Sequence, residues 1–366
     1  MNFLRRSVLP SVAAVALLAG VSAPAQAAPA KAVDDALLVS AAQEFLQHRA
    51  DTLVTGRVTA HGVTALAGGA VGTAAEIRSA ESAASTALGG RKQRLAQAGE
   101  QYTAARTEIT SSAVHRRGAD VELVVQEQTT LDYAQVRGDE PANTGFAAER
   151  TFRFSRVGGQ WVLASQRLTD QGGPLPVTEP TVAGQVAAQP TKGSAATDKP
   201  TTTGSDKITA AAYNYQAMAD YAVRYVYNYN TAYRTFADVG GDCTNFISQA
   251  LAAGGWGHVS GWYRDYRYWW YNSLNETWSW INVNFWASFA LHSGRTYNLS
   301  NVWSLGLSDI LQMDFSANSS KDHSMIVTYR SSSMPYLTYH TSNTLNRSLQ
   351  SLLDSYGGAL YYAFRT

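Results

Sequence analysis

The aromatic residues of this chain are concentrated in its second half. Eight of the nine Trp and eighteen of the twenty Tyr follow residue 205. Residues 171–206 are rich in Pro, Thr, Ala and Gly and show no apolar periodicity, which is typical of a linker. The length of 366 residues also suggests two domains. The sequence therefore predicts two unlike domains, residues 28–170 and 207–366, joined by a linker at 171–206.

Residues 1–27 have the features of a secretory signal peptide. Arg5 and Arg6 form a basic start, residues 8–21 are apolar, and Ala25 and Ala27 fit a small-residue cleavage site. The alternative is a membrane anchor, but the apolar run is shorter than the ~20 residues that span a bilayer comfortably. We therefore predict a secreted protein, extracellular or associated with the cell wall, with no membrane attachment after signal cleavage.

Composition excludes several function classes. The 29 Lys and Arg nearly balance the 28 Asp and Glu, so no broad charge field is available to bind nucleic acid or an anionic membrane. The single cysteine excludes an intrachain disulfide framework, a Cys-based zinc site and an iron–sulfur cluster. In an exported protein a lone thiol is either buried and inert or kept for its chemistry.

The first half reads as a small α+β domain. Apolar spacing predicts a helix at residues 35–52 and strands at 121–126, 149–157 and 161–168. Gly158 and Gly159 between the last two strands indicate a hairpin. The histidines of this half are scattered, without clustered carboxylates or thiols, and no catalytic pattern is found; they are His48, His61 and His115.

The second half predicts helices followed by strands. The helices are expected at residues 208–227 and 243–253, before an aromatic loop region at 256–286. Four strands follow, at residues 310–315, 324–329, 336–341 and 360–364. Helices first and strands later favour an α+β domain with an antiparallel sheet.

Cys243 stands at the first turn of the second predicted helix. Asp242 before it is a plausible N-cap, and Gly240 and Gly241 allow a sharp turn into the helix. The positive end of a helix favours a thiolate, which is the nucleophilic form of cysteine. The backbone N–H of Cys243 also points to where an oxyanion would form. The alternative is a small buried residue that faces the core.

A nucleophilic cysteine needs a base, and His323 is the strongest candidate. It stands at the start of the strand at 324–329, after a turn, where a rigid strand can hold an imidazole beside a cleft. His340 on the next predicted strand can orient that imidazole if the two strands form a hairpin. Asn343 is the alternative orienter, because an amide oxygen can also fix the tautomer. His258 and His292 read as exposed or structural histidines.

The residues around Cys243 resemble a known family. Residues 240–249, GGDCTNFISQ, are similar to the signature of the bacterial Putative amidase domain family. Residues 213–222 (YNYQAMADYA), 323–328 (HSMIVT) and 339–341 (YHT) are similar to the same family, as are Asn230, Tyr233 and Phe236. The resemblance covers about residues 205–366. That family is papain-like and akin to CHAP domains and NlpC-type cell-wall peptidases.

The resemblance implies a papain-like cysteine hydrolase fold with Cys243 as nucleophile, His323 as base and His340 as the residue that orients it. Papain places an oxyanion-hole Gln six residues before its cysteine, and Ala237 stands at that position here. The chain departs from papain at this point, and Tyr233 or the backbone near Asp242 are the remaining candidates for a second oxyanion donor.

These observations predict an exported cysteine-dependent amidase or peptidase that hydrolyses amide bonds. The resemblance implies peptidoglycan peptides, or another peptide or amide, as substrate. The mechanism needs no cofactor or metal.

The alternative is a non-catalytic protein that binds cell wall or glycan and in which Cys243 is structural. Its binding surface would come from the aromatic loops, whose tryptophans either line a groove or fill a core. These residues are Trp262, Trp269, Trp270, Trp278 and Trp280.

Overall fold

The fold is known from a computed structural model. The structure describes residues 35–58, 63–169, 173–177, 194–199, 213–236 and 241–366. The predicted signal peptide at 1–27 lies outside these residues, as do Ala237 and most of the predicted linker. Residues 35–366 form one compact unit.

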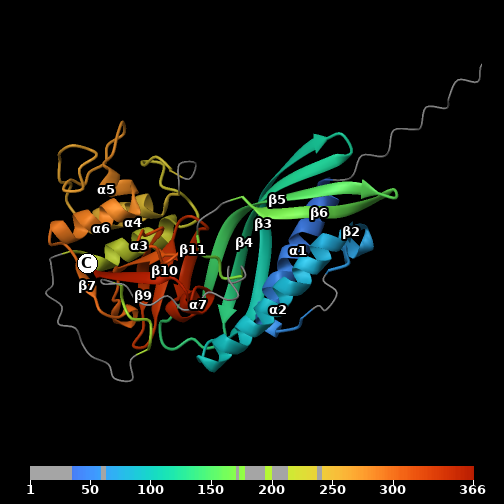
Figure 1. Cartoon of the computed structure of the whole chain (residues 1–366), viewed down its shortest axis with the longest axis horizontal. Helices are drawn as coiled ribbons and strands as arrows, with labels where there is room; N and C mark the ends of the chain where they lie inside the picture. Colours follow the sequence, from blue (N-terminus) through green and yellow to red (C-terminus); the bar gives the residue numbers. More distant parts are fainter. Residues whose placement is uncertain (1–34, 59–62, 170–172, 178–193, 200–212, 237–240) are drawn as a thin grey trace, which may run out of the picture. The chain divides into compact units, whose positions relative to one another are not determined.

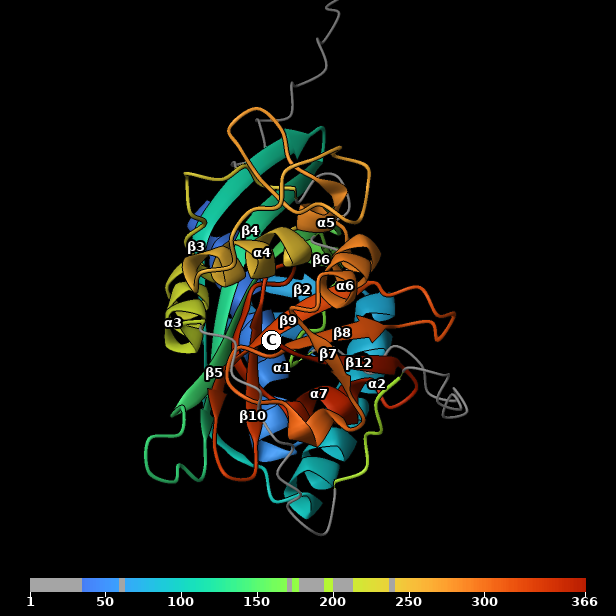
Figure 2. The same ribbon diagram turned by 90° about the vertical axis from the view of Figure 1, so that its left-hand side faces the viewer.

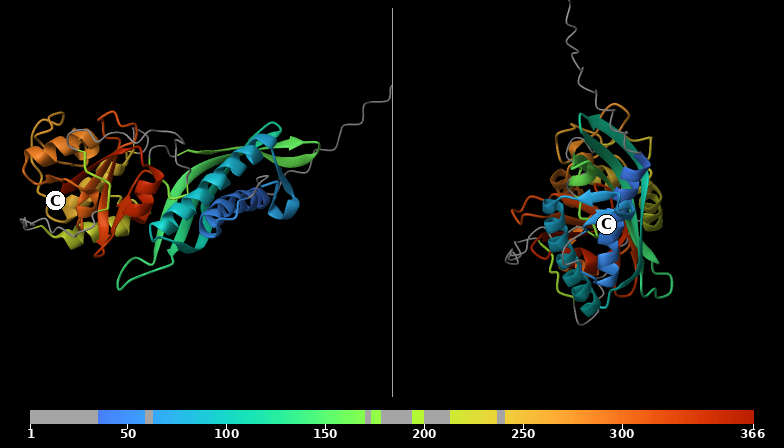
Figure 3. Two further views of the ribbon diagram at one scale, coloured as in Figure 1. Left: turned by 60° about the horizontal axis from the view of Figure 1, so that its bottom comes forward. Right: turned by 90° about the vertical axis from the view of Figure 1, so that its right-hand side faces the viewer.

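Among its described residues, the first half has two long helices and six strands. Figure 1 shows α1 and α2 side by side across one face of the long strands, and Figure 3 shows the same two helices, in blue and cyan, from below. The elements are α1 (Asp35–Thr55), β1 (Ala65–Leu66), β2 (Val71–Thr73), α2 (Ala75–Gln97), β3 (Tyr102–Arg117), β4 (Asp120–Tyr133), β5 (Asn143–Val157) and β6 (Gln160–Leu168).

The second half adds five helices and six strands among its described residues. The helices are α3 (Tyr215–Tyr225), α4 (Cys243–Ala253), α5 (Trp278–Ile281), α6 (Val283–His292) and α7 (Leu349–Ser355). The strands are β7 (Tyr297–Leu299), β8 (Ile310–Asp314), β9 (His323–Arg330), β10 (Pro335–Tyr339), β11 (Thr344–Ser348) and β12 (Leu360–Arg365). The mixed α+β class predicted from the sequence is confirmed.

Helices cover both faces of the strands of the second half. In Figure 2, α4 and α6 lie on one side of β8 and β9, and α7 lies on the other. The core on the α4 side contains Phe246, Ile326 and Trp286, and the core on the α7 side contains Met325 and Leu352. Ile326 and Met325 are neighbours on β9, so the strand alternates between the two cores as the period of two requires.

The two halves share one sheet. Strand β5 of the first half pairs antiparallel with β11 of the second, with Thr344 opposite Phe146 and Leu345 opposite Gly145. Polar contacts reinforce this junction, since Arg91 of α2 donates to the carbonyl oxygen of Ser351 at 3.0 Å. The described parts of the predicted linker are also packed: Leu175 is buried in a core that includes residues of both halves. The prediction that 28–170 and 207–366 are separate folding units stays a prediction, but structurally they meet in one sheet and one core.

We expect a fragment that starts at residue 205 to be less stable than the full chain by roughly 3 kcal/mol, since it loses the partner of β11 and exposes Tyr336. Thermal unfolding of the two proteins measures the difference. Adding a separate 28–170 fragment should raise the midpoint of the shorter protein. Equal midpoints for fragment and full chain would mean that the shared sheet contributes nothing to stability.

Candidate active site at the start of helix α4

The chain enters α4 through Gly241, whose backbone lies close to the side chain of Thr341. The Gly241 φ of +106° lies in the region that favours glycine, and an added Cβ would come within 2.9 Å of the Thr341 hydroxyl oxygen. The backbone N–H of Asp242 donates to the same oxygen at 3.0 Å. The turn after β10 therefore fixes where α4 begins.

Asp242 occupies the N-cap position of α4, but its carboxylate does not cap the helix. One oxygen accepts from the backbone N–H of Phe236 and from the Asn245 amide, each at 2.9 Å. The other oxygen lies 2.8 Å from Nδ1 of His340. Asp242 is therefore the N-cap residue as predicted, but its side chain makes no capping hydrogen bond, because His340 and the preceding loop use the carboxylate instead. The first N–H groups of α4 are left without a side-chain cap, which suits an oxyanion site.

His340 is held on every side. Its Nε2 lies 3.0 Å from the carbonyl oxygen of Tyr225, which can only accept, so Nε2 donates. Its Nδ1 lies 2.8 Å from the Asp242 carboxylate. The ring lies between Phe246 and Tyr229, at centroid distances of 3.8 and 4.0 Å. Both nitrogens are engaged, so neither is free to orient His323 in this arrangement.

Strand register explains why the two histidines do not meet. Thr338 of β10 lies opposite Ile326 of β9, and continuing this antiparallel register puts His340 opposite Ser324. Opposed residues point to the same face of a sheet, and adjacent residues point to opposite faces. His323 therefore points to the other face from His340.

The His323 imidazole is buried on the α7 side of the sheet. Its ring contacts Tyr339 at 5.1 Å and Phe315 at 6.2 Å between centroids. Its Nε2 is buried without a hydrogen-bond partner among the described residues. Burial lowers the pKa of His323 to about 3. His323, the base predicted from the sequence, is thus neutral in this structure, and its imidazole lies on the opposite face of β9 from the thiol.

The Cys243 thiol is 4% exposed. Burial raises its pKa, while hydrogen bonds from the backbone N–H of Ser324 and from the Thr244 hydroxyl oppose that rise. Because the Ser324 nitrogen is bonded to His323, the Cα of His323 lies within about 6–7 Å of the sulfur. Among the described residues no hydrogen bond joins the sulfur to either imidazole, but the backbone of His323 is adjacent to it.

Asn343, the alternative orienter, is also engaged elsewhere. Its side-chain oxygen accepts from the Tyr229 hydroxyl at 3.0 Å, and its backbone carbonyl accepts from Ala147 of β5 at 2.8 Å. Tyr233, considered as an oxyanion donor, packs against the rings of Tyr271 and Trp280. Neither predicted role is formed in this arrangement.

We expect His340→Ala to lower stability by about 3–5 kcal/mol, because it leaves the Asp242 carboxylate buried without its partner. Asn343→Ala should cost about 1 kcal/mol, since it removes one neutral hydrogen bond. Urea unfolding and kcat of both variants check this. A kcat loss of ~10²–10⁴-fold for His340→Ala with unchanged stability would instead support the orienting role.

The aromatic loops divide into two groups. Trp269 and Trp280 are fully buried and belong to the core on the α4 side, which fits the core interpretation of these residues. Trp262 is 64% exposed and Trp278 is 38% exposed, and Arg264 lies over the Trp278 ring. Trp270 is half-buried, and Tyr266 in the same loops is 42% exposed, so the rings of Trp262, Trp278 and Tyr266 can offer an aromatic surface to a ligand.

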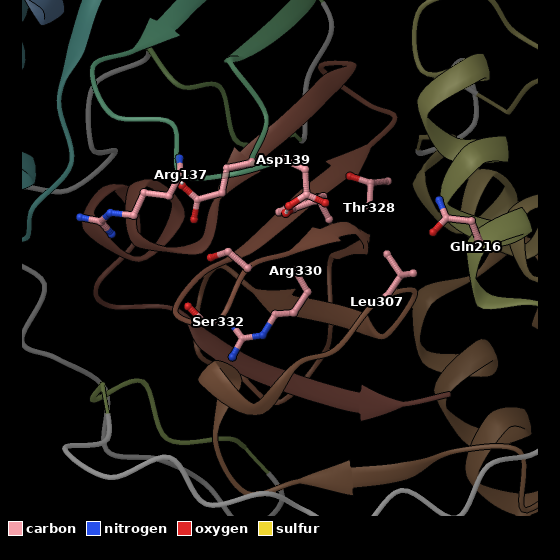
Figure 4. A pocket seen from close by; sticks show the side chains of 10 residues that line it. Arg137, Asp139, Gln216, Leu307, Thr328, Arg330 and Ser332 are labelled. Atoms are coloured by element: carbon pink, nitrogen blue, oxygen red, sulfur yellow. Dashed lines mark hydrogen bonds between the residues drawn. The ribbon is translucent and has the colours of Figure 1, made fainter.

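A cavity of about 580 Å³ lies away from the thiol. Figure 4 shows Arg137 and Asp139 on one side, Thr328 and Arg330 of the β9 region in the middle, and Gln216 of α3 on the other side. The guanidinium groups of Arg137 and Arg330 point in different directions in this view. Cys243 does not line this cavity, so the cavity is not the candidate active site.

Sequence reasoning missed the polar side chains beneath Cys243. Thr244, Ser324 and Gln312 are fully buried and hydrogen-bonded in a row from the thiol into the core. Ser324 was visible only as the residue after His323, and Gln312 only as a polar residue inside an apolar strand. Within the part of the chain that the structure describes, His, Cys, Asp and Glu form no group of three or more that could hold a metal ion. In the same residues, no helix has the length and apolar character needed to cross a bilayer.

Comparison with known proteins supports the resemblance for the second half. Residues 212–363 match the family model described as Putative amidase domain. Uncharacterized protein YjcM of Bacillus subtilis (strain 168) is 30% identical over 161 residues, which are 41% of this chain and 36% of that protein. The chain thus spans about a third of the relative's length. No solved structure matches this chain significantly.

Proposed function

Since residues 212–363 match the amidase-domain family, we propose that this chain hydrolyses amide bonds with Cys243 as nucleophile and His323 as base, in a papain-like arrangement. One observation carries the proposal. Cys243 is the first residue of α4, and its sulfur accepts the backbone N–H of the residue that follows His323. The nucleophile and the base therefore stand on adjacent backbone segments, although they are far apart in the sequence.

Catalysis requires the His323 side chain to turn toward the thiol. Its imidazole then takes the proton of Cys243, and the thiolate attacks the carbonyl carbon of the substrate. The negative oxygen of the tetrahedral intermediate accepts from the uncapped N–H groups at the start of α4. The imidazolium returns its proton to the leaving amine, and water then hydrolyses the thioester.

The buried arrangement of the two groups gives a resting enzyme of low reactivity. A raised thiol pKa and a lowered imidazole pKa both favour the neutral forms. Substrate that draws the imidazole out of the core would restore its ordinary basicity. We therefore expect the uncomplexed protein to react slowly with thiol reagents.

The proposed substrate is the peptide part of peptidoglycan, and the proposed location is outside the cell. The signal-peptide features of residues 1–27 and the resemblance to cell-wall peptidases support both proposals. Digestion of purified peptidoglycan, with mass analysis of the products, tests the substrate. New amine and carboxyl ends in the products would identify the hydrolysed amide bond, and intact muropeptides after long incubation would exclude this substrate.

A second candidate function is non-catalytic binding of cell wall or glycan. The buried thiol and the exposed rings of Trp262 and Trp278 favour it. Sedimentation with peptidoglycan and alkylation of Cys243 in its presence separate the two. Tight binding that depends on Trp262, with a thiol that stays inert beside the wall, would favour the binding protein. Faster alkylation in the presence of the wall would favour the enzyme.

A further inference from the structure

A row of hydrogen-bonded side chains leads from the Cys243 sulfur into the core. The sulfur lies 3.8 Å from the Thr244 hydroxyl oxygen, which lies 3.1 Å from the hydroxyl oxygen of Ser324. The Gln312 amide nitrogen lies 3.1 Å from that same Ser324 oxygen. Thr244, Ser324 and Gln312 come from α4, β9 and β8 respectively, and none of the three is exposed to solvent.

The inner end of this row has a fixed direction. The Gln312 nitrogen also donates to the carbonyl oxygen of Val283 at 3.0 Å, and a carbonyl can only accept. Turning the amide over would place two carbonyl oxygens together, so the nitrogen must face both Val283 and Ser324. Gln312 therefore donates to Ser324. The Ser324 proton is then free to point toward Thr244, and the Thr244 proton toward the sulfur.

This direction suits a thiolate better than a neutral thiol, whose sulfur is only a weak acceptor. A thiolate has no proton and can only accept, so with a thiolate every donor in the row points the same way, from Gln312 to the sulfur. With a neutral thiol the S–H competes with the Thr244 hydroxyl for the same contact. Burying three hydroxyl and amide groups in the core is costly unless they are hydrogen-bonded.

We infer that Gln312, Ser324 and Thr244 are positioning residues that stabilise the Cys243 thiolate from inside the core. The inference rests on the proposed function, in which that thiolate is the nucleophile. The row acts from beneath the helix and needs no contact with substrate. It offsets part of the cost of ionising a sulfur that is 4% exposed.

Two ionisable groups face the start of α4, and a third lies nearby on the opposite face of β9. The Asp242 carboxylate adjoins the thiol and opposes its ionisation. The Nδ1 atom of His340 lies 2.8 Å from the Asp242 carboxylate. His323 lies on the other face of β9. None of them is altered by substitutions at Thr244 or Ser324, so comparison among variants isolates the hydroxyl groups.

The single cysteine makes the thiol directly measurable. Protein labelled with ¹³C at the cysteine Cβ gives one resonance, whose shift with pH reports ionisation of Cys243 without any reagent having to reach it. We expect Thr244→Val, which keeps the shape and removes the hydroxyl, to raise the midpoint by about one pH unit. Thr244→Ser, which keeps the hydroxyl, should leave the midpoint near that of the wild type.

Ser324→Ala serves as the second variant if Thr244→Val does not fold. It breaks the row in the middle and should raise the midpoint in the same direction by a smaller amount. An unchanged midpoint in Thr244→Val, or in Ser324→Ala where only that variant folds, would overturn the inference. Equal shifts in Thr244→Val and Thr244→Ser would also overturn it, because packing at the helix start would then be the cause.

The titration is independent of turnover, so the two proposals fail in different ways. If Cys243→Ala retains hydrolysis, the proposed function is wrong, whatever the titration gives. If Cys243→Ala is inactive and the midpoints do not move, the function stands and only the role of the row is wrong. A fall in kcat at neutral pH in Thr244→Val that is recovered at higher pH would support both.

Discussion

Replacement of Cys243 by alanine is expected to lower hydrolysis by at least ~10³-fold while leaving the fold intact. The sulfur is the only atom removed, and its hydrogen-bond partners include the Thr244 hydroxyl and the backbone N–H groups of Thr244 and Ser324. Losing a small buried group at the first residue of a helix costs about 1 kcal/mol. Hydrolysis of the substrate and thermal unfolding, measured on the same preparation, check the two parts of this expectation.

Cys243→Ser is the matched control. It keeps a hydrogen-bonding atom at the same position, so its stability should resemble that of the wild type. A hydroxyl is not ionised by a helix N-terminus and one histidine as a thiol is, so this variant should also be nearly inactive. Retained turnover in Cys243→Ala would exclude the nucleophile, and retained turnover in Cys243→Ser would mean that ionisation of the thiol is not the limiting requirement.

Local patterns in the sequence predicted the elements that carry the candidate site. The helix predicted at 243–253 is α4, with the same bounds, because its apolar positions recur on one face and Gly254 ends it. The strand predicted at 324–329 is β9 with one more residue at each end. The hairpin at Gly158 and Gly159 is present, with positive φ at both glycines.

The missed elements are those that tertiary contacts stabilise. Helix α2 contains Gly89 and Gly90 and many small or charged residues, so its periodicity is weak, yet Arg91 is fully buried on it. Strand β11 is polar in sequence, and its Arg347 is buried because the carbonyl oxygen of Pro174 accepts from it at 2.6 Å. Such residues look exposed until their partners are known, because a buried charge needs partners that lie far away in the sequence.

The candidate site shows the limit of pattern reasoning more sharply. The sequence put His323 at the start of one strand and His340 on its antiparallel neighbour; the two strands do pair, but β10 ends at Tyr339 and His340 is the first residue after it. Whether their side chains meet depends on a register of one residue, and a single step exchanges the two faces of a strand. Pairing in β10 is irregular between Tyr336 and Leu337, and no sequence rule fixes such a shift. Thus the strands could be predicted, but the contact between the histidines could not.

His323→Leu is expected to abolish hydrolysis, by ~10³-fold or more, without destabilising the protein. An imidazole with an unpartnered buried Nε2 is exchanged for an apolar side chain of similar size, among the rings of Tyr339 and Phe315. Replacing an unsatisfied buried polar group in this way is neutral or stabilising. Catalysis needs the His323 imidazole because it turns outward to reach the thiol. The same imidazole adds nothing to the stability of the resting fold.

The pH dependence of the stability difference between the wild type and His323→Leu reports where the imidazole lies. In the unfolded chain His323 has its ordinary pKa near 6.5, and in the folded chain burial lowers its pKa to about 3. Between these two values the unfolded chain binds a proton that the folded chain does not, so wild-type stability falls as the pH falls, by at most about 1.4 kcal/mol for each unit below 6.5. His323→Leu lacks this loss, and all other groups are common to both proteins. Urea unfolding at a series of pH values should therefore show the stability of the variant increasing relative to that of the wild type from pH 6.5 downward.

If the imidazole instead rests against a Cys243 thiolate, its folded pKa is raised. The wild type is then more stable than the variant at low pH, and it loses this advantage as the pH rises through the raised pKa. The sign of the change in this stability difference with pH thus decides between a buried neutral imidazole and a preformed ion pair. Only the buried neutral imidazole destabilises the folded wild type relative to the variant as the pH falls.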